Sequence, residues 1–166
     1  MTGLTVGDIA RITGGTLHGG DASASVTGAV IDSRKAAEGT MFCALPGERV
    51  DGHDYIASAL AKGAPCALAS RVPEGVSGGV IVVPDVASAM ARLARECRER
   101  FAGPVVGIVG SSGKTTAKEM VACVLAEKFN TLRTEGNLNN ELGVPLTLFR
   151  IAVSYTHLTL PTILLV

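Results

Sequence analysis

PVVGIVGSSGKTTAKEMVACVLAE, residues 104–127, carries the strongest structural signal in this sequence. It opens with an apolar, mostly β-branched run over 105–109, bounded by a proline and by glycines, which predicts a buried parallel strand. A turn of glycine and serine follows. From residue 114 onward the spacing predicts a helix with Met120, Val121, Val124 and Leu125 on its apolar face and Lys118, Glu119 and Glu127 on other faces.

Strand, glycine turn and helix N-terminus in succession predict an anion-binding site, because free backbone N–H groups and the positive end of the helix dipole point into the turn. The turn contains Gly113-Lys114-Thr115, the core of the phosphate-loop pattern G-x-x-x-x-G-K-[ST]. The match is not strict, since the position of the first glycine holds Ile108 and the nearest glycines are Gly107 and Gly110.

Residues of this turn suit the binding of a nucleoside triphosphate. Gly113 lets the backbone approach a phosphate, Lys114 can place its ammonium group against the β- and γ-phosphates, and Thr115 can offer its hydroxyl to Mg²⁺. Small polar donors complete the candidate ATP-binding set, which is Gly110, Ser111, Ser112, Gly113, Lys114, Thr115 and Thr116. ATP and Mg²⁺ are therefore the predicted cofactors.

Two other interpretations of the turn remain open. Gly107-x-x-Gly110-x-x-Gly113 is similar to a variant dinucleotide-binding turn, and Glu135 lies near the distance at which an acidic residue holds a ribose. That motif calls for a small or apolar residue after the third glycine, where this chain has Lys-Thr-Thr, so a phosphate loop is favoured. A plain strand-to-helix turn with an incidental lysine leaves the clustering of Gly, Ser, Lys and Thr unexplained.

Composition excludes several classes of protein. With 166 residues the chain can hold one domain, or a small domain and part of another. A formal net charge of zero, with 18% charged residues, argues against nucleic acid as a partner. No apolar run approaches the roughly 20 residues needed to cross a bilayer, and the N-terminus lacks the pattern of a signal peptide. Four dispersed cysteines in apolar segments indicate reduced core thiols, so a soluble, cytoplasmic protein is expected.

The remaining chain alternates short strands with helices, which predicts an α/β fold. Strands are expected over 16–19, 26–32, 39–45, 65–70, 78–84 and 130–134, and helices from Thr5, over 52–63, over 85–101 and from Glu141. The third helix should bury Val86, Met90, Leu93, Ala94, Cys97 and Phe101, with its arginines and glutamates on a solvated face. We expect a first domain over 1–84 and a second α/β domain over 85–151.

A polar loop follows the strand expected at 130–134. Its asparagines, Asn137, Asn139 and Asn140, suit either a structural turn or a ligand contact. Ligand contact gains weight because α/β sheets bind ligands along the carboxyl ends of their strands. Asp32-Ser33-Arg34-Lys35 is likewise compatible with a simple solvated turn.

GSSGKTT-x-KEM followed by GNLNNELGVPLTL closely resembles the Mur ligase family, and so do the segments IDSRKAAEGTMFCALPGERVDGHDYI and AKGAPCALAS. These motifs occur in the family's order from near the start of the chain to about residue 150. The resemblance implies a small N-terminal α/β domain that binds a UDP-sugar, followed by an ATPase domain with the phosphate loop, here truncated. A C-terminal Rossmann-like domain would complete such an enzyme.

The resemblance also implies an activity in peptidoglycan precursor synthesis. ATP would phosphorylate the terminal carboxylate of UDP-N-acetylmuramoyl-tripeptide, and the amine of D-alanyl-D-alanine would attack the acyl phosphate. Lys114 would act as the catalytic cation and Thr115 would help to hold Mg²⁺. Ser33 and Arg34 would contact the uridine diphosphate, and Asn137, Asn139 and Asn140 would line the substrate side. Alternatives are the family member that adds the third amino acid, or a non-catalytic UDP-sugar-binding module.

Residues 152–166, AVSYTHLTLPTILLV, depart from the family pattern. The family continues there into the rest of its central sheet, so we expect this tail to be non-native and assign no role to Tyr155 or His157. A short edge strand that is native to this protein is the alternative. We also expect the chain as printed to be a monomer that is not catalytically competent by itself.

Overall fold

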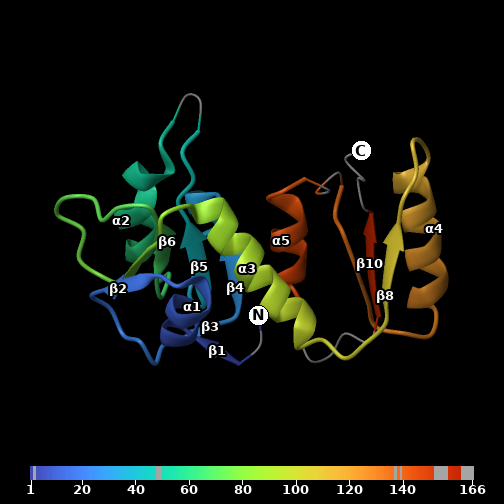
Figure 1. Cartoon of the computed structure of the whole chain (residues 1–166), viewed down its shortest axis with the longest axis horizontal. Helices are drawn as coiled ribbons and strands as arrows, with labels where there is room; N and C mark the ends of the chain where they lie inside the picture. The colour runs from blue at the N-terminus through green and yellow to red at the C-terminus, as the bar shows by residue number, and fades with distance from the viewer. Residues whose placement is uncertain (2, 48–49, 137, 139, 152–156, 162–166) are drawn as a thin grey trace. The chain divides into compact units, whose positions relative to one another are not determined.

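A computed structural model describes residues 1, 3–47, 50–136, 138, 140–151 and 157–161, the last of these by backbone alone. The chain divides into two compact units, Met1–Leu93 and Ala94–Val166. Each unit combines helices with a largely or wholly parallel sheet, which confirms the predicted α/β class (Figure 1). This division falls inside a helix, and the domain boundary placed between residues 84 and 85 stays a prediction. No helix within the described ranges is long and apolar enough to cross a membrane.

A five-stranded sheet with the order β2-β7-β6-β5-β4 forms the centre of the first unit. Its strands are β2 (Thr16–His18), β4 (Gly28–Val30), β5 (Thr40–Cys43), β6 (Ala67–Ala69) and β7 (Val80–Val82). All neighbours are parallel except β2, which runs antiparallel to β7. The carboxyl ends of β4, β5 and β6 therefore meet at one edge of the sheet.

One predicted strand is divided in the structure. The stretch expected over 26–32 contributes to β3 (Ser25–Val26), which pairs antiparallel with β1 (Leu4–Thr5), and to β4 in the large sheet. The division occurs because the backbone N–H groups of Thr27 and Gly28 both donate to the carbonyl of Gly39. A single extended strand is therefore interrupted where its backbone changes partner.

Residues that alternate along the strands bury the two faces of this sheet. On one face a cluster joins strand residues to the helix α2 (Ile56–Ala61), and its members include Phe42, Ile56, Ala59, Ala67, Ala69 and Val80. The intervening residues Met41, Cys43, Leu68 and Ile81 are fully buried on the other face. A single 3-10 turn, η2 (Gly52–Tyr55), leads into α2, so the helix predicted over 52–63 forms with a tighter start.

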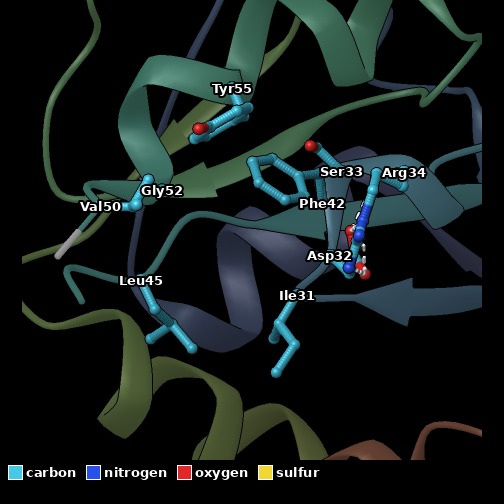
Figure 2. A pocket seen from close by; sticks show the side chains of 9 residues that line it. All are labelled: Ile31, Asp32, Ser33, Arg34, Phe42, Leu45, Val50, Gly52 and Tyr55. Atoms are coloured by element: carbon cyan, nitrogen blue, oxygen red, sulfur yellow. Dashed lines mark hydrogen bonds and ion pairs between the residues drawn. The ribbon is translucent and has the colours of Figure 1, made fainter. Parts of the chain in front are cut away.

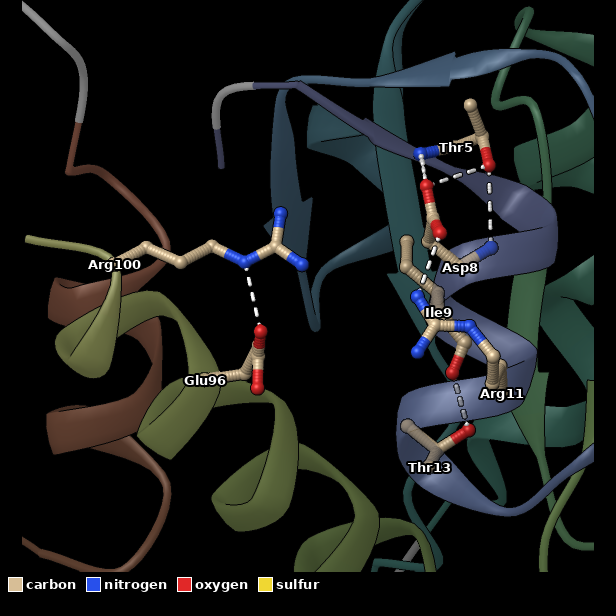
Figure 3. Close-up of polar contacts among 7 residues, drawn as sticks. All are labelled: Thr5, Asp8, Ile9, Arg11, Thr13, Glu96 and Arg100. Atoms are coloured by element: carbon tan, nitrogen blue, oxygen red, sulfur yellow. Dashed lines mark hydrogen bonds and ion pairs between the residues drawn. The ribbon is translucent and has the colours of Figure 1, made fainter.

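The first helix, α1 (Val6–Thr13), begins after Thr5 as predicted. The hydroxyl of Thr5 accepts a hydrogen bond from the backbone N–H of Asp8 at 3.1 Å, and the Asp8 carboxylate accepts one from the backbone N–H of Thr5 at 3.1 Å (Figure 3). This reciprocal pair is a capping box. At the other end Gly14 adopts a left-handed conformation, with φ of 66°, and ends the helix.

The long helix α3 (Val86–Glu99) has the two faces that the sequence predicted. Val86, Met90, Leu93, Ala94, Cys97 and Phe101 are all buried. The opposite face carries ion pairs one turn apart. Arg95 pairs with Glu99 at 2.9 Å, and Arg100 pairs with Glu96 at 2.8 Å (Figure 3). Its charges therefore serve a solvated helix surface.

The second unit contains a parallel three-stranded sheet with the order β8-β10-β9. Its elements are β8 (Val105–Ile108), α4 (Lys114–Ala126), β9 (Thr131–Arg133), α5 (Gly143–Leu148) and β10 (His157–Pro161). Because the strands are parallel, the turn after β8 and the loop after β9 leave the same edge of the sheet. The prediction that residues 152–166 are non-native stays a prediction, and 152–156 and 162–166 lie outside the described residues.

Side-chain burial in the second unit differs from the sequence-based expectation. β8 is half-buried rather than fully buried, and in α4 the side chains of Met120 and Val124 are 66% and 73% exposed. Lys118, which was expected on an outer face, is 0% exposed. Cys123 is exposed, so the expectation of a core thiol is wrong there, whereas the other three cysteines are buried. The helix therefore packs along the line of Lys118 and Ala122.

Candidate functional site

The phosphate loop predicted at 110–116 connects β8 to the first residue of α4. Gly113 is the N-cap of α4 and has φ of 76°, a left-handed conformation that glycine adopts without strain. No side chain caps this end of the helix by a hydrogen bond. The loop and the first turn are exposed at Ser111, Ser112, Thr115 and Thr116. Backbone N–H groups at the helix start are thus available to an anion.

Lys114 folds back over the loop from which it starts. Its ammonium group donates to the carbonyl oxygen of Gly110 and, at 3.3 Å, to that of Ser111. The cation therefore lies against the turn, close to the position that a bound phosphate would take in a loop of this kind.

Lys118 joins α4 to the end of β9, a role that was not predicted from the sequence. Its ammonium donates to the carbonyl oxygens of Thr134 at 2.7 Å and Gly136 at 3.2 Å, and pairs with Glu119 at 2.9 Å. Glu119 also pairs with Arg133 at 3.2 Å. The hydrogen bond from Lys118 holds the pKa of Glu119 below its ordinary value. The phosphate-loop helix and the start of the asparagine loop are consequently held together.

A cavity of about 410 Å³ lies in the first unit, at the carboxyl ends of β4 and β5 (Figure 2). It is lined by Ile31, Asp32, Ser33, Arg34, Phe42, Leu45, Val50, Gly52 and Tyr55. Ser33 and Arg34, both predicted to bind substrate, lie on the 3-10 turn η1 (Ser33–Lys35) that follows β4. Figure 2 shows the rings of Phe42 and Tyr55 on the side of the cavity formed by β5 and η2.

Polar contacts within the first unit hold the Ser33–Arg34 turn in place. Lys62, at the end of α2, donates to the carbonyl oxygen of Ser33 at 2.9 Å. The guanidinium of Arg34 pairs with Asp32 through Nε at 2.9 Å and Nη2 at 2.7 Å. This pairing lowers the pKa of Asp32 to about 2. Arg34 is nevertheless 85% exposed and can present its remaining N–H groups to an anionic ligand.

Comparison with known proteins places these two regions in one family. A model of the Mur ligase catalytic domain matches residues 25–98, and a model of the Mur ligase middle domain matches residues 108–160. The UDP-N-acetylmuramoyl-tripeptide–D-alanyl-D-alanine ligase of Escherichia coli is 40% identical over 157 residues, which is 95% of this chain. The chain belongs to the Mur ligase family.

Solved structures of Mur ligases agree with this assignment. MurF from Acinetobacter baumannii matches 97% of the chain with a TM-score of 0.86 and 34% identity. MurF from Thermotoga maritima, in complex with ADP, matches 83% with a TM-score of 0.73 and 37% identity. The chain spans about a third of the length of these relatives, 34% of the Escherichia coli ligase and 36% of the Acinetobacter structure. The resemblance found in the sequence is confirmed at the level of the family.

The asparagine loop of this Mur ligase chain is only partly described. Asn137 and Asn139 lie outside the described residues. The carboxamide oxygen of Asn140 accepts a hydrogen bond from the backbone N–H of Gly143 at 2.7 Å and so supports the start of α5. The amide nitrogen and the second lone pair of this oxygen remain available for a ligand. Gly143 is required by close packing, since a Cβ there would lie 2.5 Å from the backbone of Leu138.

Two further expectations concern cofactors. Thr115 is exposed at the second residue of α4, where its hydroxyl fits a Mg²⁺ ion carried by a nucleotide. Among the described residues no group of three or more His, Cys, Asp or Glu side chains could hold a metal ion. Glu135, which a dinucleotide turn would use for a ribose, is paired with Arg150 at 2.8 Å.

Proposed function

We propose that this chain provides the UDP-sugar pocket and the ATP-binding loop of a ligase that joins D-alanyl-D-alanine to UDP-N-acetylmuramoyl-tripeptide. The observation that carries the proposal is the pairing, in one Mur ligase chain, of an uncapped phosphate-loop helix with the Ser33–Arg34 cavity. The name of the Escherichia coli relative and the ADP bound to the Thermotoga structure support the substrate and the nucleotide.

The phosphate loop would hold ATP through its backbone and its small polar side chains. The phosphates would be surrounded by Gly110, Ser111, Ser112, Gly113 and Thr116, and Thr115 would offer its hydroxyl to Mg²⁺. The ammonium group of Lys114 would leave the carbonyls of Gly110 and Ser111 and contact the transferred phosphoryl group. There it would neutralise the negative charge of that group. Phosphoryl transfer depends mainly on such positioning and charge neutralisation, so no protein nucleophile is required.

The reaction proceeds in two steps that together form an amide bond. A carboxylate oxygen of the tripeptide attacks the γ-phosphorus of ATP, and ADP leaves, which gives an acyl phosphate. The amine of D-alanyl-D-alanine then attacks the acyl carbon and expels inorganic phosphate. Asn137, Asn139 and Asn140 would line the substrate side of this centre.

The cavity of the first unit suits the uridine diphosphate end of the substrate. Arg34 offers a cation to the diphosphate, and Ser33 offers a hydroxyl beside it. The rings of Phe42 and Tyr55 supply apolar surface for the uracil base (Figure 2). The cavity would therefore bind the uridine diphosphate end of the substrate, which is remote from the carboxylate that reacts.

Binding of two ligands to purified variants tests the proposal. Calorimetry should show that Lys114→Ala loses ATP affinity by about 100-fold, because the main cation for the phosphates is removed, while UDP affinity is unchanged. Arg34→Ala should give the opposite result, with UDP affinity lowered by about ten-fold and ATP affinity unchanged. A chain that binds UDP but no ATP would support a non-catalytic UDP-sugar-binding module instead.

Turnover separates the full reaction from binding. We expect the printed chain to release no phosphate from ATP in the presence of UDP-N-acetylmuramoyl-tripeptide and D-alanyl-D-alanine, and robust turnover would contradict this expectation. A panel of UDP-peptides, applied to an active longer form, would distinguish this ligase from the family member that adds the third amino acid. The proposed setting is a cytoplasmic, monomeric enzyme with ATP and Mg²⁺ as cofactors.

A further inference from the structure

A buried histidine lies behind one wall of the Ser33–Arg34 cavity. His53 is 2% exposed. Its Nδ1 contacts Oδ1 of Asp51 at 2.5 Å, and its Nε2 lies 3.1 Å from the backbone nitrogen and 2.9 Å from the hydroxyl of Ser70. Asp51 and His53 flank the cavity residue Gly52, and Ser70 directly follows β6. The ring thus connects two segments that are seventeen residues apart.

Partners on both sides define the state of this ring. A backbone N–H can only donate, so the Nε2 atom that faces Ser70 N must be the acceptor. Nδ1 then carries the hydrogen and donates it to Asp51, which gives a neutral imidazole in a single tautomer. Asp51 also accepts from the backbone N–H of His53 at 2.9 Å and from Arg71 at 2.7 Å, and these contacts keep its pKa well below the ordinary range.

The same stretch forms one side of the cavity. Val50, Gly52 and Tyr55 all line it, and each is within three residues of His53. Gly52 also packs against the facing segment, because its N–H donates to the carbonyl of Leu45 at 2.9 Å and a Cβ would lie 2.6 Å from that oxygen. Movement of residues 50–55 away from β6 would therefore change the shape of the cavity.

We propose that His53 is a positioning residue of the nucleotide-sugar cavity, which holds the wall formed by residues 50–55 against the end of β6 through Asp51 and Ser70. This inference rests on the proposed uridine diphosphate site and adds to it the residue that shapes the site. His53 contacts no ligand in this scheme. It acts by keeping Gly52 and Tyr55 in the positions that close the cavity.

The order Asp51–His53–Ser70 is also that of a hydrolytic triad, in which histidine removes the serine proton. The backbone N–H of Ser70 argues for the positioning role, because it already donates to the one lone pair of Nε2. This backbone N–H is fixed by the fold, so Nε2 stays occupied and is not free to take the proton of the serine hydroxyl. The hydroxyl of Ser70 therefore adds a second contact to a ring whose function is structural.

Three variants test the proposal by UDP affinity and by local hydrogen exchange. His53→Asn can still donate to Asp51 but does not reach Ser70, and we expect UDP affinity to fall by about ten-fold. Exchange of the Gly52 and His53 amides should accelerate by at least about ten-fold, with the β5 and β6 amides unchanged. Ser70→Ala keeps the backbone N–H and should lower affinity by about two-fold or less. Ile9→Val, a core truncation in α1, is the control and should leave UDP affinity unchanged.

The outcomes separate this inference from the proposed function. Wild-type affinity in His53→Asn, or equal loss in Ile9→Val, overturns the positioning role. If the wild-type chain binds no UDP, the proposed site fails, yet selective exchange at residues 50–55 in His53→Asn still supports the role of the ring in holding this wall. Covalent labelling of Ser70 by a fluorophosphonate, lost in His53→Asn, would overturn the proposal in favour of a triad.

Discussion

Two helices of this chain begin in opposite ways. The start of α1 is closed by its own side chains, since Thr5 and Asp8 bond reciprocally to backbone N–H groups (Figure 3). The start of α4 has glycine at the N-cap and no side-chain hydrogen bond to the first turn. Both helices carry the same partial positive charge at this end. Only α4 leaves it available to a ligand.

The same contrast extends to the regions around the two helices. In the first unit, Lys62, Asp32 and His53 fix the cavity walls before any ligand arrives. In the phosphate loop, the serines and threonines are exposed and Lys114 rests on loop carbonyls. The cavity of the first unit is thus shaped by internal side-chain contacts, whereas the phosphate loop is shaped by backbone geometry and has no side-chain cap at the start of α4.

Lys118 is the exception, because it is an internal contact beneath the phosphate loop. Lys118→Met retains most of the apolar volume but leaves the carbonyls of Thr134 and Gly136 without their donor. We expect a loss of about 2–3 kcal/mol of unfolding free energy in the second unit, measured by urea denaturation. Lys128→Met changes an exposed lysine of the same unit and should cost less than about 0.5 kcal/mol. Equal losses in the two variants would remove the structural role of Lys118.

Gly113→Ala tests whether backbone conformation shapes the phosphate loop. A Cβ at this position meets nothing within 4 Å, so the cost comes from φ of 76° alone and should be about 1–2 kcal/mol. ATP affinity should also fall, because an alanine at the N-cap would move the backbone out of its left-handed conformation. Gly110→Ala is the matched control, since its φ is not in the left-handed region and its Cβ would lie at an ordinary 3.4 Å from Ser112. A larger loss in Gly110→Ala would contradict this account.

Local patterns in the sequence predicted most of the fold, and the ligand roles of both sites stay predictions. The start of α1 at Thr5, the buried stripe of α3 and the turn before Lys114 all depend on residues within a few positions of each other. Burial of Lys118 could not be predicted in this way, because its acceptors are carbonyls sixteen and eighteen residues away. The cavity around Ser33 likewise combines η1 with the later stretch 50–55, and only the fold brings them together.

Thr5→Ala should leave the N-terminus of α1 without its side-chain cap, so that it resembles the uncapped N-terminus of α4. Loss of the hydroxyl removes one half of the capping box, with an expected cost of about 1 kcal/mol in the first unit. Ser112→Ala, next to the N-cap of α4, should leave the stability of the nucleotide-free chain unchanged, since Ser112 is exposed and caps nothing. Thermal denaturation of both variants measures the difference, and a destabilised Ser112→Ala would show that α4 is also closed from within.

Acid should weaken the closed end of α1 in a defined range of pH. Hydrogen bonds from Arg11 and from Thr5 lower the pKa of Asp8 from an ordinary 3.8 to about 2. Because the folded-state pKa is below that of the unfolded chain, Asp8 stabilises the fold above about pH 4, and this contribution disappears as the pH falls through about 2. Asp8→Asn should therefore differ most from the wild type at neutral pH, and the gap between their urea midpoints should narrow between about pH 4 and pH 2. If the difference between the two urea midpoints stays constant down to pH 2, Asp8 contributes as a hydrogen-bond acceptor and not through its negative charge. The starts of α1 and α4 would then differ in side-chain capping but not in electrostatic stabilisation.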